Sequence, residues 1–380
     1  MEELKKIIQE SIDYHEQGEY EAAEVVLQRA MMWLDRNCPA EEESETLDLF
    51  EGQVVPLIEQ RKYKSALPYL EHILKLKPNY RWAFAEYIKC LWVLGYHKTF
   101  WEVYERRRDF FQNLVIYRRM FGRNTMWDGK SSLDGKKVLV HGEQGAGDQI
   151  QFIRYLPLLK EAYDCHIILN CSLSLASLFE QLDCVDEILP KEHTFLNYKP
   201  LEFDVHLPMM SLPYHLGIHE PVPEVHFKAT REYNLLAWEP DKLHVGFIFT
   251  ANPHSHGAEM RSLPPDRIWN LMRHSQDKQF FHLHHKEKCS SKGVVNIHPL
   301  DFQDLANYVS LMDKIVTIDS ALLHLAGSMG KETLALIPRR ADWKWEGNTT
   351  PWYKSVRLAH QKTSGDWSNV FPEAFDFIQR

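Results

Sequence analysis

The sequence predicts an α/β protein in which two units of parallel sheet follow an all-α region. Residues 1–115 are almost free of glycine and of strand-like runs, which favours helices throughout. From about residue 130, short apolar runs alternate with amphipathic segments, as strands and helices do in parallel sheets. A polar, proline-rich linker divides this alternating series. We therefore expect three domains, over residues 1–115, 116–235 and 236–380.

The all-α region contains three segments that resemble one another, "YEAAEVVLQRAMMWL", "YKSALPYLEHILKLKPNY" and "WAFAEYIKCLWVLGYHKTFWEVYERR". Tyr63 and Tyr96, each followed three residues later by a small residue, occupy matching places 33 residues apart, and Tyr20 opens an earlier copy. This spacing is close to the period of about 34 residues in tetratricopeptide repeats. The region is therefore interpreted as tetratricopeptide-like, with an ordinary helical bundle as the alternative.

The first alternating series has apolar runs short enough for strands, and its amphipathic segments have helical spacing. Strands are expected over residues 136–142, 165–171, 186–190 and 203–210. Helices are expected over residues 149–162 and 175–182. The linker that ends the series is "GIHEPVPEVHFKATREY", residues 217–233.

The second series repeats the alternation. Strands are expected over residues 243–250, 279–285, 294–299, 314–319 and 332–338. Helices are expected over residues 265–275, 301–312 and 320–330. Two parallel-sheet units joined by a linker leave a cleft that strand carboxyl ends face, and open α/β sheets bind ligands at such edges.

Composition excludes several classes of protein. A net charge of −9 over 380 residues argues against a general polyanion-binding surface. The six cysteines are scattered without a C-x-x-C pair, which favours reduced thiols over a disulfide framework or a zinc site. No apolar run approaches the roughly 20 residues of a membrane span, and "MEELKKIIQESID" differs from a secretion signal. We expect a soluble, cytoplasmic protein without membrane insertion.

One stretch, "HGEQGAGDQIQF" at residues 141–152, reads as a strand that ends in a glycine-rich turn and opens a helix. Its G-x-x-G-x-G spacing differs from the dinucleotide fingerprint, and the next expected strand ends without the acid that would bind a ribose. No G-K-[ST] follows, which excludes a phosphate loop. The turn instead carries one carboxylate, Asp148.

Four segments occur in a characteristic order: "LDGKKVLVHGEQGAGDQIQFIRYLPLL", "ANPHSHGAEMRSLP", "DFQDLANYVSLMDKIVTIDSALLHLAGSMGK" and "PRRADWKWEGNTTPWYKSVRL". With them the chain resembles the heptosyltransferase-like glycosyltransferases of the GT-B architecture, in the branch with N-terminal tetratricopeptide repeats. The resemblance covers essentially the whole chain. It implies two Rossmann-like domains facing across a cleft, with the nucleotide-sugar donor bound mainly by the second. It also implies inverting, metal-independent transfer.

The resemblance implies that Asp148 is the general base that removes a proton from the acceptor hydroxyl. The residues alone also allow a structural role, in which Asp148 is a helix N-cap and Gln151 completes a capping box. A fully engaged cap would be a poor base. Gly145 and Gly147 are expected to leave space for a sugar or acceptor. Gln149 and Gln151 are expected to contact it.

The start of the helix expected at Ser320 is the predicted diphosphate site. Free N–H groups and the positive end of the helix dipole suit a departing nucleoside diphosphate when no metal is present. The predicted donor-binding residues here are Asp319, Ser320, Ala321 and His324. The alternative is a well-capped buried helix, in which His324 is a core residue.

Arg261 is the predicted cation for the diphosphate, because its loop follows the strand over residues 243–250 and should overhang the cleft. The resemblance also implies a basic residue at this place. Asn252 and Thr250, at the end of the same strand, are expected to join it. A solvated surface arginine is the alternative.

The stretch "FHLHHKEKC" suggests a metal site at first sight. On a strand, however, His282 and His284 share a face while His285 points the other way. Zinc needs three or four convergent ligands, so no metal is expected. The resemblance instead implies ribose or base contacts from His284, Lys286 and Glu287.

Aromatic residues follow the last expected strand. Trp343, Trp345 and Trp352 are expected either to stack on a sugar or base, or to pack between the domains. Arg339 and Arg340 add positive charge to the same region.

The leading hypothesis is an inverting glycosyltransferase that moves a hexosyl, pentosyl or heptosyl group from a nucleotide sugar, its substrate, without any cofactor. The acceptor would be a protein or glycan, and the repeats would bind a protein partner or only support the fold. A second hypothesis places the same chemistry on a hydroxylated base in phage DNA, suggested by the basic clusters "YERRRDFF", "YRRMFGR" and "PRRADWK". A third is a non-catalytic repeat scaffold with a degenerate transferase shell.

Overall fold

The structure, a computed structural model, describes residues 2–17, 22, 25–26, 29, 43–109, 121–122, 125–191, 202–233, 235, 237–253, 255, 257–272 and 275–380. The chain divides into two compact units, residues 1–110 and 111–380. Tyr20, Cys38 and the domain boundary expected near residue 115 lie outside the described residues.

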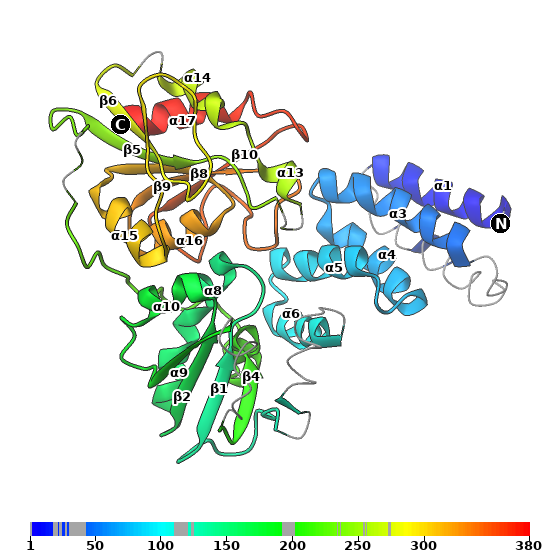
Figure 1. Ribbon diagram of the computed structural model, residues 1–380. Coiled ribbons are helices and arrows are strands. Elements are labelled where there is room, and N and C mark those ends of the chain that lie inside the picture. Colours follow the sequence, from blue (N-terminus) through cyan, green and yellow to red (C-terminus); the bar gives the residue numbers. More distant parts are fainter. Residues whose placement is uncertain are drawn as a thin grey trace. The chain divides into compact units, whose positions relative to one another are not determined.

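The described elements of the first unit are helices (Figure 1). They are α1 (Glu2–Glu16), α3 (Glu43–Glu59), α4 (Tyr63–Leu76), α5 (Arg81–Val93), α6 (His97–Tyr104) and the 3₁₀ helix η2 (Glu105–Asp109). From α3 to α6 each helix packs against the next. In α4, Ala66, Leu70 and Ile73 are fully buried. Their three- and four-residue spacing is that of one helix face, so burial of this stripe stabilises the helix.

The two tyrosines that suggested a repeat differ in their surroundings. Tyr63 begins α4 and is buried, whereas 51% of Tyr96 is exposed at the start of α6. Tyr96 follows Gly95, whose φ of +79° allows the chain to turn between α5 and α6. The assignment of tetratricopeptide repeats therefore stays a prediction.

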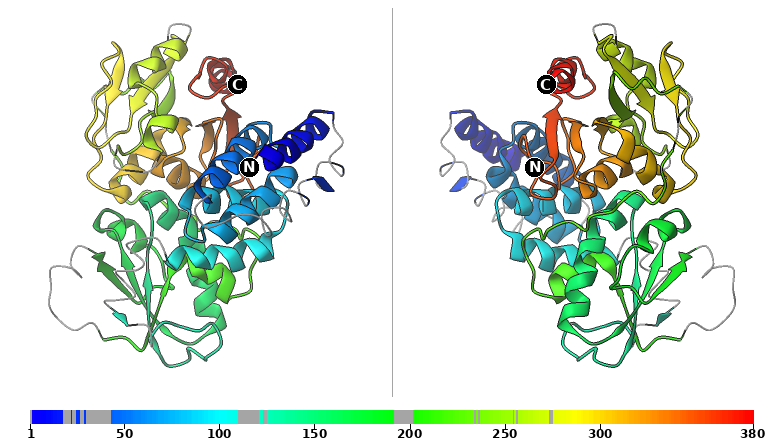
Figure 2. Two further views of the ribbon diagram at one scale, coloured as in Figure 1. Left: turned by 90° about the vertical axis from the view of Figure 1, so that its right-hand side faces the viewer. Right: turned by 90° about the vertical axis from the view of Figure 1, so that its left-hand side faces the viewer.

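The second unit begins with a lobe drawn in green in Figure 2. It is built on a parallel sheet of order β3-β2-β1-β4. Its strands are β1 (Lys137–His141), β2 (His166–Cys171), β3 (Glu187–Pro190) and β4 (Val205–Pro208). Its helices are α8 (Ala146–Phe152), η3 (Ile153–Tyr155), α9 (Leu156–Ala162), α10 (Leu173–Phe179), η4 (Met209–Ser211) and α12 (Leu212–His215). The strands confirm the prediction. The single helix expected over residues 149–162 is interrupted by the 3₁₀ turn η3, and Pro157, in the first turn of α9, has no N–H with which to continue the helical hydrogen bonds.

The second lobe contains a parallel sheet of order β10-β9-β8-β5-β6-β7. Its strands are β5 (Leu243–Ile248), β6 (Lys278–His282), β7 (Val294–Asn296), β8 (Lys314–Ile318), β9 (Glu332–Ile337) and β10 (Val356–His360). Its helices are α13 (Ala258–Arg261), η5 (Pro265–Ile268), α14 (Trp269–Met272), α15 (Phe302–Leu311), α16 (Ala321–Ser328) and α17 (Val370–Gln379). The five expected strands are present. The prediction missed β10, α13 and α17.

The strands of this lobe are almost wholly buried, as expected for a parallel sheet covered on both faces. One core includes Phe247, Phe280 and Leu336 of the sheet, with Ala374 and Ile378 of α17 packed on them. Alternation of strands with helices therefore predicted the layers correctly.

The linker over residues 217–233 is held by side chains of both lobes. Gln181 exchanges two hydrogen bonds with the backbone of Lys228, each 3.0 Å long. Gln303 of α15 donates to the Lys228 carbonyl at 3.2 Å and accepts from Gln181 at 2.6 Å. The two lobes also meet where α8 packs against α16.

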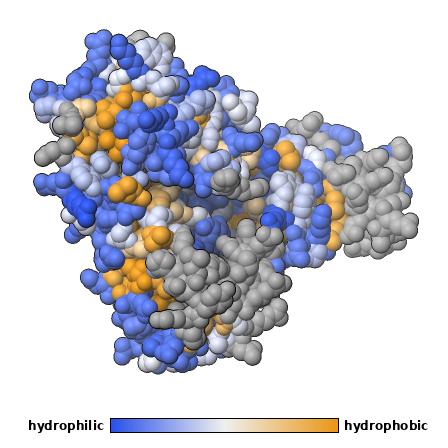
Figure 3. Space-filling view, viewed as in Figure 1, coloured by the Kyte–Doolittle hydropathy of each residue, from blue (hydrophilic) through white to orange (hydrophobic). Residues whose placement is uncertain are grey.

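Hydrophilic residues cover most of the face of the second lobe seen in Figure 3, with smaller hydrophobic patches between them. Single exposed apolar side chains occur, such as Leu300 (91% exposed) and Trp269 (54%). Across the described residues, no helix is long and apolar enough to cross a bilayer. The described cysteines, Cys90, Cys165, Cys171, Cys184 and Cys289, are free thiols.

Candidate functional site

The candidate donor site lies at the carboxyl edge of three neighbouring strands, β8, β5 and β6. The chain proceeds from β5 to β6 and β7 on one side, and from β8 to β10 on the other. The order therefore reverses between β5 and β8, and ligands bind at such a switch point in open α/β sheets. Thr250 follows β5, His284 follows β6, and Asp319 follows β8. The fold thus gathers predicted residues that are distant in sequence.

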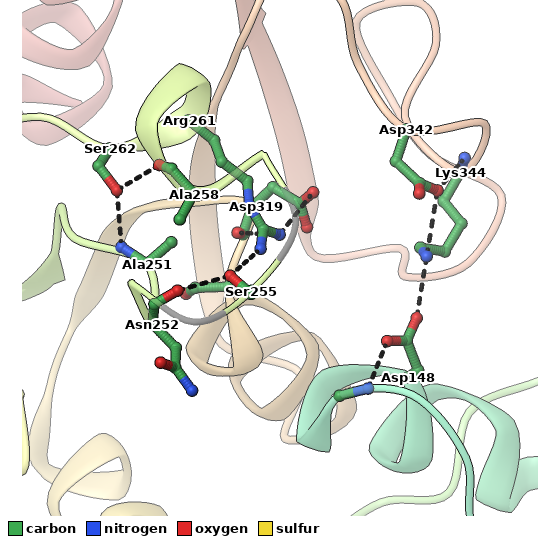
Figure 4. A network of polar contacts seen from close by, with 12 residues as sticks. Asp148, Ala251, Asn252, Ser255, Ala258, Arg261, Ser262, Asp319, Asp342 and Lys344 are labelled. Atoms are coloured by element: carbon green, nitrogen blue, oxygen red, sulfur yellow. Dashed lines mark hydrogen bonds and ion pairs between the residues drawn. The ribbon is translucent and has the colours of Figure 1, made fainter. Parts of the chain in front are cut away.

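Arg261 pairs with Asp319 at this edge (Figure 4). Its Nη1 lies 3.2 Å from the Asp319 carbonyl oxygen and 3.4 Å from Oδ2, and its Nη2 donates to Ser255 Oγ at 2.7 Å. The Arg261 side chain is 23% exposed and that of Asp319 is 11% exposed. Arg261 is therefore a positioned, partly accessible cation rather than a solvated surface arginine.

Burial raises the pKa of Asp319 above its ordinary value, and the charges of Arg261 and Lys344 oppose that effect. A buried carboxylate is more easily protonated because its charge has lost water.

The start of α16 has backbone N–H groups that the Ser320 side chain does not cap within the described residues. The Ser320 hydroxyl instead lies 3.2 Å from that of Thr317. The first turn of α16 is thus able to donate to a ligand, as predicted for Ser320 and Ala321, although α8 packs against the same helix.

His324 occupies the core side of α16. It is 3% exposed, and its Nδ1 lies 3.0 Å from the Tyr353 hydroxyl. Burial, followed by the charge of Lys344, lowers the pKa of His324 well below its usual range, so the ring is neutral. Of the two predicted roles, the structure places His324 in the role of a core residue.

Asp148 lies at the third position of α8 and engages both of its oxygens. Oδ2 accepts the Gly145 N–H at 3.1 Å, while Oδ1 accepts from Lys344 Nζ at 3.0 Å. The expected N-cap role of Asp148 is corrected. Gly145 is the N-cap, and the Asp148 side chain, at the third helical position, accepts the N–H of that N-cap residue. The Asp148 side chain is 18% exposed, so it is not turned into the interior.

Lys344 is the site residue that the sequence interpretation missed. Its side chain is 6% exposed, and its ammonium lies 3.1 Å from Asp342 Oδ1 as well as beside Asp148. It also lies 5.3 Å from the centre of the Trp343 ring. The sequence did contain one indication of its role. Lys344 lies between Trp343 and Trp345 in the loop after a core strand, and ligand-binding residues often lie in such loops.

The glycines and glutamines of the α8 turn have structural surroundings. A Cβ added at Gly147 would lie 2.6 Å from His324 Cδ2, so Gly147 permits the approach of α16 and does not leave space for a sugar. Gln149 is buried, and its amide bonds the N–H and hydroxyl of Ser172. Gln151 is fully buried, so a sugar does not reach it here, and its amide has no partner among the described residues.

The predicted nucleoside residues form a small cluster after β6. His284 Nδ1 accepts the N–H of Glu287 at 2.8 Å and that of Lys286 at 3.3 Å. Burial, followed by His285, lowers the pKa of His284 to about 4. The Glu287 carboxylate accepts a hydrogen bond from Thr250, which joins this cluster to the end of β5. Lys286 is exposed, and Asn252 is exposed in the neighbouring loop.

The histidines after β6 do not converge on a point. Where the structure describes the chain, no group of three or more His, Cys, Asp or Glu side chains is arranged to hold a metal ion. His282 contacts Asn296 instead, and Cys289 contacts Asp266.

The tryptophans after β9 are buried. Trp343 is 5% exposed, while Trp345 and Trp352 are fully buried, so packing is the role in which they are found. Trp352 lies against Phe152 of the first lobe, with ring centres 6.0 Å apart, and Arg154 lies over its ring.

The basic clusters are only partly available to a polyanion. Arg107 is fully buried and pairs with Glu105 at 2.9 Å, and Arg108 pairs with the same carboxylate. Lys344, in the last cluster, is engaged by Asp148 and Asp342. The middle cluster, "YRRMFGR", lies mostly outside the described residues.

No known protein-family profile matches the chain. Protein FlbA of Caulobacter vibrioides (strain ATCC 19089 / CIP 103742 / CB 15) is 25% identical over 309 residues, which is 70% of this chain and 50% of that protein. The chain therefore spans about half the length of this curated relative. Similar solved structures include a glycosyl transferase family 9 protein from Veillonella parvula DSM 2008, with 14% identity and a TM-score of 0.45 over 62% of this chain and 88% of that one. Another is the ADP-heptose LPS heptosyltransferase II of E. coli, with 13% identity and a TM-score of 0.45 over 64% of this chain and 98% of that one.

Proposed function

We propose that the chain is an inverting, metal-independent glycosyltransferase of the GT-B type that uses a nucleotide-sugar donor. The observation that carries the proposal is the placement of Asp148. This carboxylate of the first lobe meets Lys344 of the second, in the lobe where Arg261 and the start of α16 offer anion-binding groups. The ordered motifs that resemble heptosyltransferase-like enzymes support the same assignment.

In the proposed reaction the acceptor hydroxyl attacks the anomeric carbon of the donor sugar. The new carbon–oxygen bond forms as the bond to the diphosphate breaks, and Asp148 accepts the hydroxyl proton. The electron pair of the broken bond leaves with the nucleoside diphosphate. Arg261 and the N–H groups of Ser320 and Ala321 stabilise its charge in place of a metal.

Lys344 has to change partner for Asp148 to act as a base, because its ammonium donates to Asp148 Oδ1 in this structure. A bound diphosphate competes for the same ammonium. Transfer of Lys344 to the phosphates would free Oδ1, while the Gly145 N–H still orients the carboxylate through Oδ2. Donor binding would in this way activate the base.

The donor nucleoside is proposed to lie along the ends of β5 and β6, near His284, Lys286 and Glu287. Glu287 offers a carboxylate to ribose hydroxyls, provided that it exchanges its bond from Thr250. The helical unit is proposed to bind the acceptor or to support the catalytic lobes.

Calorimetric titration with UDP, GDP, ADP and CDP tests the proposal. One of them should bind wild type. It should bind Asp148→Asn at least as tightly, because the amide competes less for Lys344, and Arg261→Gln about tenfold or more weakly, since a charge-assisted bond is lost. Arg357→Gln, at an exposed arginine of β10, is the control and should bind normally. With the matching donor sugar, Asp148→Asn should lose transfer. If Asp148→Asn transferred the sugar as well as wild type, the assignment of Asp148 as general base would be refuted. If no nucleoside diphosphate bound, the scaffold hypothesis would be favoured.

A further inference from the structure

A concave site lies in the same lobe, and its lining does not include Asp148. The arginine cavity, as we name it, is lined by residues within the segments 259–270, 338–340 and 361–375, and its volume is about 930 Å³. These segments include α13 and the loops after β9 and β10 (Figure 1). The volume is within the range of about 300–1,000 Å³ typical of small-molecule sites.

Three arginines line the cavity, Arg267, Arg339 and Arg340. They stand out in a chain of net charge −9. Arginine presents a planar fork of donors that fits the oxygens of a phosphate or carboxylate. The lining therefore favours an oxyanion.

Gln361 provides an independent observation. It lines the cavity, is 1% exposed, and its Oε1 accepts the Arg339 N–H at 3.0 Å. Its Nε2 has no partner among the described residues. A buried N–H without an acceptor is unfavourable because it has lost its hydrogen bond to water, so a ligand oxygen at this point would bind favourably.

Apolar groups form another wall. Trp367, Phe371 and Phe375 line the cavity and pack against the core of the lobe. Aromatic faces of this kind accommodate the ring of a ligand. Two acids also line the cavity, but Asp366 already accepts the N–H and hydroxyl of Ser368, which leaves Glu259 as the acid without a described partner.

The arginine cavity is distinct from the donor site, although α13 borders both. Glu259, Met260 and Ser262 line the cavity, whereas the Arg261 guanidinium between them reaches Asp319. Substitution of Arg261 should therefore affect one site and substitution of Arg267 the other.

We propose that the arginine cavity binds an acidic sugar, that is, a sugar ring carrying a phosphate or a carboxylate. The arginines and the Gln361 amide would bind the oxyanion, and the aromatic wall would contact the ring. The proposal stands on these residues and does not depend on the base chemistry at Asp148.

Calorimetric titration of the full chain with glucose 6-phosphate and with glucuronate tests the inference, with glucose as the neutral control. At least one acidic sugar should bind and glucose should not, and the two acidic arms distinguish phosphate from carboxylate. Arg267→Gln should weaken binding about tenfold or more. Gln361→Glu, which keeps shape and the Arg339 contact but adds charge, should abolish it.

Arg261→Gln and Arg357→Gln should bind the acidic sugar as wild type does. The proposal is overturned if neither acidic sugar binds, if glucose binds equally well, or if the cavity variants leave binding unchanged. Loss of binding in Arg261→Gln alone would also overturn it, because the ligand would then occupy the donor site. Far-ultraviolet circular dichroism and the unfolding midpoint show whether each variant is folded.

Discussion

Lys344 Nζ lies 3.0 Å from Asp148 Oδ1 and 3.1 Å from Asp342 Oδ1, so one buried ammonium is shared by two carboxylates. The Asp148 pair connects the two lobes of the second unit, whereas the Asp342 pair is local. Because the Lys344 side chain is only 6% exposed, salt screens this contact less than it screens a surface pair. The pair therefore bears on both stability and the availability of Asp148.

Replacement of Lys344 by methionine should lower the free energy of unfolding by about 1–3 kcal/mol, since two carboxylates lose a charged donor. A double-mutant cycle with Asp148→Asn should give a coupling energy of about 0.5–3 kcal/mol. Urea unfolding of the four proteins measures it. As a control, the Lys242–Glu239 pair, whose side chains are 33% and 53% exposed, should couple by only about 0.2–1 kcal/mol. Equal coupling in both cycles would contradict a special role for Lys344.

Gly147→Ala should destabilise the second unit by about 1–3 kcal/mol, because the new methyl group would lie 2.6 Å from His324 and α16 would have to move. Differential scanning calorimetry measures the change. Gly52→Ala, within helix α3 and with no atom within 4 Å of the added carbon, should instead stabilise the chain by about 0.5–1 kcal/mol. If Gly147→Ala did not lower stability, His324 and α16 would have to move aside at little cost.

Asp319→Asn should tighten the binding of the nucleoside diphosphate that the chain accepts. The amide oxygen still accepts from Arg261, while removal of the negative charge reduces repulsion by about 1 kcal/mol, the Coulomb energy of charges 4 Å apart in water. Calorimetry measures the affinity, and Asp376→Asn, at an exposed acid of α17, is the control. Weaker binding by Asp319→Asn would mean that the carboxylate charge itself assists the ligand.

Stability should fall as the pH decreases from about 7 to 5. The pKa of His284 is about 4 in the folded chain, against an ordinary 6.5, and the pKa of His324 is also lowered by burial. The unfolded chain therefore binds protons first, and the stability present above pH 6.5 is lost on acidification. The urea midpoint across this range should fall less steeply in His284→Gln than in wild type. His166→Gln, at an exposed histidine, should retain the wild-type slope.

The layers of the fold were predictable because parallel strands leave long apolar runs. Strand β1 is buried over residues 138–141, and its neighbours follow the same pattern. The prediction missed β10, whose "VRLAH" exposes Arg357 in a short strand that pairs only with β9 among the described strands. The polar residues Arg357 and His360 conceal the strand signal there.

Residues of the candidate site were predictable where each lies in the loop that follows the carboxyl end of a strand. Asp319 and Arg261 come together in this way across the β5–β8 switch. Lys344 was not predicted, because its pairing with Asp148 joins residues 196 positions apart and depends on how two lobes meet. Gly147 was assigned space for a sugar, since the sequence does not reveal that His324 fills it.

The hydrogen bonds of Gln181 and Gln303 to Lys228 affect how the two lobes can move. Gln181 and Gln303, from opposite lobes, hold one point of the linker backbone and each other. If the lobes separated while these three contacts remained, they would rotate about Lys228. The α8–α16 packing and the Asp148–Lys344 contact would then be strained. In that case, a ligand large enough to separate the lobes would break the Lys344–Asp148 contact that occupies the Asp148 carboxylate.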